Sequence, residues 1–393
     1  MSPLAPLVLS SALLAAFAKA QDVTGTFPAT PLASKHYQYP DQIPYQVDDD
    51  KGLIRGTQFG YNLCNSTTEG QDALCQTSFL NSLDDFCLWA PSKPNSLIAD
   101  TEGEEVAWCT KPGRGTRLIP DGALTGVQFM RTSAYVQVIG FMDQTKINIA
   151  DGDYGGELDP HGADLRGNPM GGLVYSTAFS SSGDEYTQMI EWHNFMGGNA
   201  FCFKVCDPSN EHAADFCQHI YDRIGCAYNA PNNAQDNVFE SCEGDVQDYP
   251  GVYTGEDGQV TTYTQPPESL GAITTMPYQP KVPASSNCQT FTSADLYSAL
   301  ASVSADPSNS AASSSATGDS SSAASGSHAA SSGTGTATRG AATHAAASGT
   351  GAAAEASGSN AAMGFRGGAD GAVWSGLLWA GVAAVAGAVG VMA

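Results

Sequence analysis

The sequence lacks the short motifs that mark common catalytic and cofactor-binding sites. It has no Gly-x-Ser-x-Gly, no His-Glu-x-x-His, no P-loop and no dinucleotide-binding fingerprint. It also has no Cys-x-x-Cys and no histidine pair at zinc-finger spacing, so its cysteines do not predict a structural zinc site. We therefore expect a protein without catalytic residues and without a cofactor.

Basic residues are scarce as well. The 393-residue chain has 16 Lys and Arg against 40 Asp and Glu, and its formal net charge of −24 falls almost entirely between Gln21 and Ser302. An acidic surface repels phosphate backbones and anionic lipid head groups, so we expect no nucleic-acid partner. Divalent cations and basic partners stay open, although solvated acidic faces are the simpler explanation.

Large hydrophobic residues are missing from one long segment. From Ser304 to Ala361 there is no Val, Leu, Ile, Met, Phe, Tyr or Trp, and Ser, Ala, Gly and Thr dominate. Such a segment cannot bury a core, so residues 303–361 are predicted to form a disordered stalk. Its hydroxyl groups are candidate O-glycosylation sites.

The first 20 residues predict a signal peptide. They are apolar and end in Ala18-Lys19-Ala20, which suits cleavage before Gln21, although a basic start is missing. A buried N-terminal helix is the competing interpretation, which Pro3 and Pro6 disfavour.

Residues 362–393 predict a removable GPI-anchor signal. Small residues and a polar spacer precede an apolar, uncharged run that closes the sequence. We expect attachment at Asn360, with Ser357 or Ser359 as alternatives. A retained membrane helix is the competing interpretation, but no Lys or Arg follows the run to fix a cytosolic end.

What the chain does have is an even number of cysteines, which predicts a disulfide framework in a secreted protein. The ten are Cys64, Cys75, Cys87, Cys109, Cys202, Cys206, Cys217, Cys226, Cys242 and Cys288. Their connectivity stays open, with one exclusion. Cys202 and Cys206 would lie ~13 Å apart on one strand, whereas a disulfide needs Cα atoms within roughly 7 Å.

The stretch from Thr187 to Cys226 predicts a β-hairpin followed by a short helix that ends at Gly225. In its second arm Phe201, Phe203 and Val205 share one face, and Cys202, Lys204 and Cys206 share the other. The turn falls at Met196-Gly197-Gly198-Asn199, because these residues tolerate positive φ. We expect disulfides to join the hairpin to the helix and its exit.

Similar patterns predict the rest of the fold. We expect a mainly β, disulfide-stabilised, sandwich-like single domain over residues 51–302, with one or two short helices, after an extended lead-in over residues 21–50. Strands are expected at 126–130, 135–141 and 145–150, a helical turn at 78–86, and a hairpin within 251–263.

The segment from Asp151 to Met170 is the most unusual polar stretch, with several acidic residues among five glycines. Asp151, Asp153 and Glu157 are candidate calcium ligands, although the closing Glu of an EF-hand is missing. A glycosidase-like carboxylate pair, with an acid of this segment facing Glu191, is a further alternative. A solvated acidic loop is the simplest interpretation.

The histidines add weaker candidates. His193 shares a strand face with Glu191, and His212 and His219 would lie on one face of the expected helix, where they could hold a metal or haem iron. His161 lies in the acidic segment. A packed or solvated histidine is the simpler explanation in each case.

Asn65-Ser66-Thr67 is the only Asn-x-Ser/Thr sequon, and it predicts an N-glycan at Asn65 in a secreted chain.

Residues 51–288 carry a resemblance to a known family. The matching blocks are KGLIRGTQFGYNLCNSTTEGQDALCQTSFLNSLDDFCLWAP, EEVAWCTKPGRGTRLIPDGALTGVQF, DGDYGGELDPHGADLRGNP and FCQHIYDRIGCAYNAPNNAQ. They resemble the basidiomycete secreted proteins called macrophage-activating glycoprotein, which include the cryptococcal immunoreactive mannoproteins. The resemblance implies a mannan-type glycan recognised by host lectins and immune receptors, and it implies no catalytic residues.

Together these features predict a GPI-anchored, glycosylated fungal mannoprotein of the cell surface or cell wall. Its role would be structural, interactive or immunogenic, with cell-wall glycans as partners. A carbohydrate-binding or haem- or metal-binding module is the alternative, and a glycoside hydrolase is a lesser one.

Overall fold

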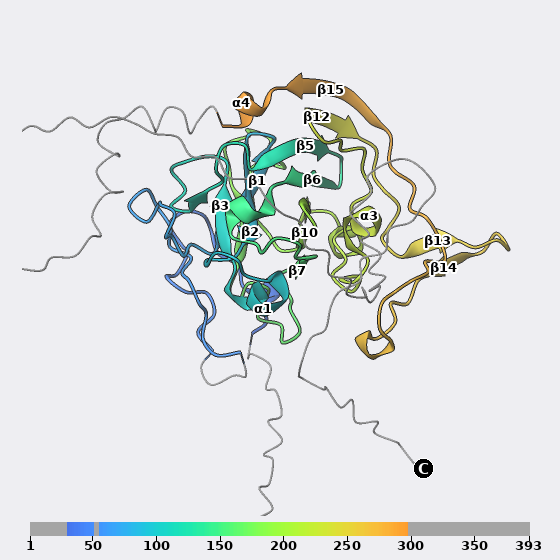
Figure 1. Cartoon of the computed structure of the whole chain (residues 1–393), viewed down its shortest axis with the longest axis horizontal. Coiled ribbons are helices and arrows are strands. Elements are labelled where there is room, and N and C mark those ends of the chain that lie inside the picture. Colours follow the sequence, from blue (N-terminus) through green and yellow to red (C-terminus); the bar gives the residue numbers. More distant parts are fainter. Residues whose placement is uncertain (1–29, 51–54, 298–393) are drawn as a thin grey trace, which may run out of the picture.

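The computed structural model describes residues 30–50 and 55–297, which form a mainly β structure built on two large sheets (Figure 1). The six-stranded sheet has the order β4-β3-β2-β1-β8-β9, and the seven-stranded sheet has the order β15-β12-β5-β6-β11-β10-β7. Strands β13 and β14 form a separate hairpin that projects to the right in Figure 1. The expected mainly β class is confirmed.

The strands of the six-stranded sheet are β1 (Thr77–Ser82), β2 (Asp85–Ala90), β3 (Val106–Cys109), β4 (Arg117–Leu118), β8 (Leu173–Ser176) and β9 (Thr187–Met189). Those of the seven-stranded sheet are β5 (Leu124–Arg131), β6 (Tyr135–Met142), β7 (Gly156–Leu158), β10 (Trp192–Gly197), β11 (Ala200–Cys206), β12 (Phe239–Gly244) and β15 (Ser285–Phe291). The small hairpin consists of β13 (Val252–Thr254) and β14 (Val260–Thr262). The last pair confirms the hairpin expected within residues 251–263.

The two large sheets pack face to face through aromatic side chains. Trp89 of β2 lies against Trp192 of β10, with ring centroids 6.0 Å apart, and Phe86 lies 6.1 Å from Phe201. The backbone N–H of Trp89 also donates to the Asn194 side chain across the interface at 3.0 Å. All five side chains are buried, so this interface is the main hydrophobic core.

The hairpin β10–β11 lies within the seven-stranded sheet and separates two environments. Phe201, Phe203 and Val205 belong to the core between the sheets. On the opposite face, Cys202 and Cys206 pack under the segment that comes after the hairpin. The turn residues Gly198 and Asn199 have φ of 62° and 58°, as the sequence predicts. Alternation along β11 therefore assigned both faces correctly.

All ten cysteines are paired in the described residues. The bridges are Cys64–Cys75, Cys87–Cys109, Cys202–Cys226, Cys206–Cys217 and Cys242–Cys288. The two bridges from β11 hold residues 207–230 over the outer face of the seven-stranded sheet. This confirms that Cys202 and Cys206 do not pair with each other and that disulfides join the hairpin to residues 207–230.

Four α-helices of four or five residues occur in the described residues, more than the one or two expected. They are α1 (Ile98–Thr101), α2 (Ala213–Phe216), α3 (Gly225–Asn229) and α4 (Ser293–Leu296). Single 3-10 turns occur at η1 (Leu32–Ser34), η2 (Glu102–Glu104), η3 (Gln144–Ile147) and η4 (Glu268–Leu270). None of these helices has the length and apolar character needed to cross a membrane.

Three local expectations were wrong. The expected strand at 145–150 begins as η3, because the Asp143 side chain accepts the Thr145 N–H and closes a turn. The expected helical turn at 78–86 is the hairpin β1–β2. The expected helix after the long hairpin ends at Phe216, and Gly225 begins α3 instead of ending a helix. Disulfides at Cys217 and Cys226 hold this segment in two short pieces.

The described part of the lead-in, residues 30–50, packs on the domain. Tyr39 contacts Phe79 and Tyr175 with centroid distances of 5.3 Å each. Asp48 is buried against Arg166, whose Nε donates to it at 3.0 Å. This ion pair connects the lead-in to the acidic segment that carries the site below.

Candidate functional site

A cluster of two imidazoles and a carboxylate lies near the edge strand β7. His161 follows β7, Glu191 lies between β9 and β10, and His219 lies between α2 and α3. One donor atom from each lies within 4.8 Å of the others, and His161 Nε2 is 3.4 Å from Glu191 Oε2. The two imidazole rings stack with centroids 3.7 Å apart and planes 15° apart. Three distant segments thus meet at one point.

Each member of this cluster is positioned by its own segment. The Asp159 carboxylate accepts the backbone N–H groups of His161 at 2.7 Å and of Gly162 at 2.8 Å. The Glu191 carbonyl accepts the backbone N–H of Cys206 at 3.0 Å. Cys206 is bridged to Cys217, two residues before His219. The disulfide therefore brings His219 to the strand that neighbours Glu191.

Burial favours the neutral form of the His219 imidazole. Burial lowers the pKa of His219 to about 4; nearby His161 acts in the same direction and Glu191 opposes it. Close by, His193 is fully buried, and burial followed by the charge of Lys204 lowers the pKa of His193 well below its ordinary value. Neutral imidazole offers a nitrogen lone pair for hydrogen bonding or for a metal.

Four carboxylates with raised pKa come from segments near the cluster; Glu157 and Asp159 are buried, Glu102 is partly exposed and Asp222 is exposed. Burial raises the pKa of Glu102, Glu157, Asp159 and Asp222, and for the first three repulsion from neighbouring acids raises it further. Both carboxylate oxygens of Glu157 are buried, and no hydrogen-bond partner for them occurs in the described part of the chain. A carboxyl group in such a place is easier to bury protonated than charged.

The structure does not gather the three candidate calcium ligands into one group. Asp151 is exposed. The Asp153 carboxylate accepts the N–H of Ile98 at 2.9 Å and that of Gly155 at 3.1 Å. Glu157 is buried opposite Phe195 on the neighbouring strand. The Asp153 carboxylate thus holds backbone N–H groups and the Glu157 carboxylate is buried, so these two do not join Asp151 in one set of calcium ligands.

The carboxylate-pair alternative also lacks a direct contact. The Glu191 carboxylate contacts His161. In the described residues no hydrogen bond or ion pair joins Glu191 to an aspartate of the acidic segment. Asp164 instead forms an ion pair with Arg55. The described geometry therefore offers a histidine–carboxylate cluster where the sequence suggested two carboxylates.

His212 does not share a helix face with His219. It precedes α2, is half exposed, and pairs with Asp215 at 3.0 Å. The chain leaves helical geometry at Cys217, so the expected seven-residue spacing along one helix does not exist. The predicted pair is wrong, and His161 is the partner of His219.

A cavity of about 500 Å³ is lined by residues that begin immediately after His219, although none of the three cluster residues lines it. Its walls come from residues 220–223 and from residues 262–268, the loop that follows the β13–β14 hairpin. Tyr221 and Tyr263 contribute aromatic rings, and Asp222 and Arg223 contribute charge. Its volume is in the range of small-ligand pockets.

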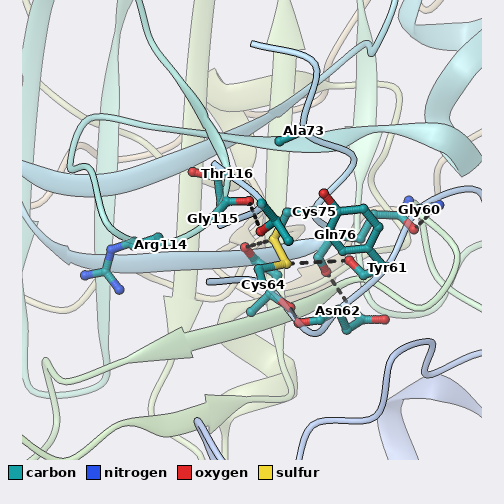
Figure 2. The surroundings of a disulfide bond; sticks show 12 residues. Gly60, Tyr61, Asn62, Cys64, Ala73, Cys75, Gln76, Arg114, Gly115 and Thr116 are labelled. Carbon is teal, nitrogen blue, oxygen red and sulfur yellow. Dashed lines mark hydrogen bonds between the residues drawn. A yellow bond between two sulfur atoms is a disulfide. The ribbon is translucent and has the colours of Figure 1, made fainter. Parts of the chain in front are cut away.

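The predicted glycosylation site lies on the surface beside a disulfide. Figure 2 shows the Cys64–Cys75 bridge between Tyr61 and Gly115. Asn65 is exposed, and its side-chain oxygen accepts the Thr67 hydroxyl at 2.6 Å. An N-glycan at this position stays a prediction. The signal peptide, the stalk and Asn360 lie outside the described residues.

Two fungal proteins are similar to this chain over more than half of its length. The chain is 42% identical over 308 residues to "Appressorium protein ROW1" of Mycosarcoma maydis, an alignment that covers 72% of this chain and 69% of that protein. The chain belongs to the family of ROW1. "Appressorium protein ROW2" of the same organism is 44% identical over 220 residues, covering 55% of this chain and 73% of ROW2.

These ROW proteins come from a basidiomycete, which agrees with the fungal origin that the sequence blocks implied. No protein-family model matches the chain. No solved structure matches it either. The ROW relationship therefore rests on the sequence alone.

The grouping of His161, Glu191 and His219 could not be found from the sequence. The three residues are separated by 30 and 28 positions, and no motif spacing connects them. The only available signal was the position of His219 two residues after a cysteine, once that cysteine's partner on β11 is known.

Proposed function

We propose that this protein is a disulfide-stabilised extracellular glycoprotein of the fungal surface that acts at the appressorium by binding and not by catalysis. The observation that carries the proposal is the pairing of all ten cysteines in a chain related to appressorium proteins. Such pairing is typical of proteins that fold in an oxidising compartment and stay outside the cell.

The surface features support the same setting. Asn65 is exposed beside a rigid bridge, where a glycan would extend into solvent. We call the expected domain of residues 51–302 the head. The net charge of −24 would keep a secreted head soluble. In this proposal residues 303–361 are an O-glycosylated stalk, and a GPI anchor at Asn360 holds the head at the plasma membrane or cell wall. Mannan-type glycans would then be what cell-wall partners and host lectins meet.

The anchor is tested by enzymatic release. Phosphatidylinositol-specific phospholipase C should move the protein from the membrane fraction of fungal cells into the supernatant, because it cleaves the lipid from a GPI anchor. A chain truncated after Ala361 is the control, and it should appear in the medium without treatment. Protein that stays with the membranes after complete digestion, while a known GPI protein is released, would contradict the anchor.

A further inference from the structure

We propose that His161, Glu191 and His219 bind one divalent transition-metal ion, with Zn²⁺ as the ion of first choice. Two imidazole nitrogens and one carboxylate are a donor set that suits zinc and its neighbours, whereas calcium prefers oxygen donors alone. Three protein ligands leave one coordination position for water or for a ligand from solution. Zinc binding does not depend on the anchor, since all three residues lie in the head.

The distances are close to those of a bound site. Ligand atoms held about 2.0–2.2 Å from one tetrahedral ion lie roughly 3.3–3.6 Å apart. His161 Nε2 and Glu191 Oε2 are separated by 3.4 Å, and one donor atom from each of the three residues lies within 4.8 Å of the others. Binding therefore requires a change in side-chain torsions that brings the third donor atom closer.

The stacked rings define the movement that binding requires. With planes only 15° apart, the two imidazoles cannot both direct an in-plane lone pair at one point. At least one ring must turn about its Cβ–Cγ bond, a soft torsion with broad minima. All three side chains are partly exposed, so solvent borders the cluster and an ion can reach it.

The framework behind the ligands is fixed, which lowers the cost of assembling the site. The Cys206–Cys217 bridge holds the segment of His219 beside β11, and the backbone of Cys206 is hydrogen-bonded to Glu191. Asp159 secures the backbone of His161. The other donor group in the described residues, Glu240 with Cys242 and Cys288, is closed because its two sulfurs form a disulfide.

Calorimetry of the processed, disulfide-intact protein tests the site. After treatment with EDTA and buffer exchange, titration with Zn²⁺ should show one ion bound per chain, and Ca²⁺ should give no heat. The variants His161→Ala, Glu191→Gln and His219→Ala should each weaken Zn²⁺ binding by more than the ~10–100-fold that loss of an outer-shell partner costs. His212→Ala is the matched control, because His212 is exposed and separate from the cluster, and it should bind like the parent.

A second readout covers variants that fold poorly. Co²⁺ bound to the parent should give the visible absorption of a site with nitrogen and oxygen donors, and X-ray absorption should count two imidazoles. Zn²⁺ should raise the melting temperature of the parent and of His212→Ala, and should leave that of the His161→Ala/His219→Ala double variant unchanged. Equal binding by parent and double variant, or no binding of Zn²⁺ by the parent, would overturn the proposal.

Discussion

Replacing Arg166 by methionine is expected to lower the free energy of unfolding by about 3–5 kcal/mol, because it leaves a buried carboxylate without its counter-charge. The side chains of Arg166 and Asp48 are 0% and 3% exposed. Arg166 Nε donates to Asp48 at 3.0 Å, and Arg166 Nη2 donates to the Gly56 carbonyl. Denaturant unfolding followed by tryptophan fluorescence measures the loss.

Two comparison variants isolate the cause. Arg166→Met combined with Asp48→Leu removes both charges, and should recover most of the lost stability, since buried ion pairs replaced by apolar side chains are often neutral. Asp49 pairs with Lys35 at the surface, and the Asp49 side chain is 90% exposed. Asp49→Ala should therefore change the free energy of unfolding by less than about 1 kcal/mol. If Arg166→Met has the same free energy of unfolding as the parent, the Arg166–Asp48 ion pair does not stabilise the packing of residues 30–50 on the rest of the structure.

Removing the Cys206–Cys217 bridge is expected to cost about 2–4 kcal/mol, and also to weaken Zn²⁺ binding. The loop-closure entropy returned to the unfolded chain accounts for the first effect. The second arises because this bridge holds the segment of His219 beside Glu191. Both cysteines should be replaced by alanine, and stability and calorimetric titration should be measured on the same preparation.

The Cys64–Cys75 bridge supplies a matched control. It closes a loop of the same sequence separation, 11 residues, and lies beside Gly115 (Figure 2), on segments that hold none of the three cluster residues. Its removal should cost similar stability and leave Zn²⁺ affinity unchanged. If both double variants lose Zn²⁺ binding to the same extent, the bridge at Cys217 has no specific role in positioning His219.

Much of the fold was predictable where one physical rule decides the outcome. Alternation along β11 assigned its two faces, because a strand repeats every two residues and one face must be buried. The glycines at 197 and 198 marked the turn, since this turn needs positive φ. The exclusion of a Cys202–Cys206 bridge needed only the length of an extended strand.

The predictions failed where tertiary contacts override local pattern. Ile147 and Ile149 alternate as in a strand, yet both are buried through the η3 turn that Asp143 closes. Phe216, Ile220 and Ile224 recur at helical spacing, but two disulfides fix their segment in short pieces, and Ile220 is 53% exposed. His161, Glu191 and His219 come from three segments that are distant in the sequence. The way the chain folds, and not the spacing of these residues, therefore sets the geometry of the site.

Disulfide mapping of the secreted protein tests the central claim most directly, namely that oxidative pairing closes the head and fixes its site. Proteolysis without reduction, followed by mass spectrometry, should yield the five linked peptides Cys64–Cys75, Cys87–Cys109, Cys202–Cys226, Cys206–Cys217 and Cys242–Cys288, with no thiol labelled before reduction. Labelled thiols in the folded protein, or a peptide linking Cys217 to any cysteine other than Cys206, would contradict it.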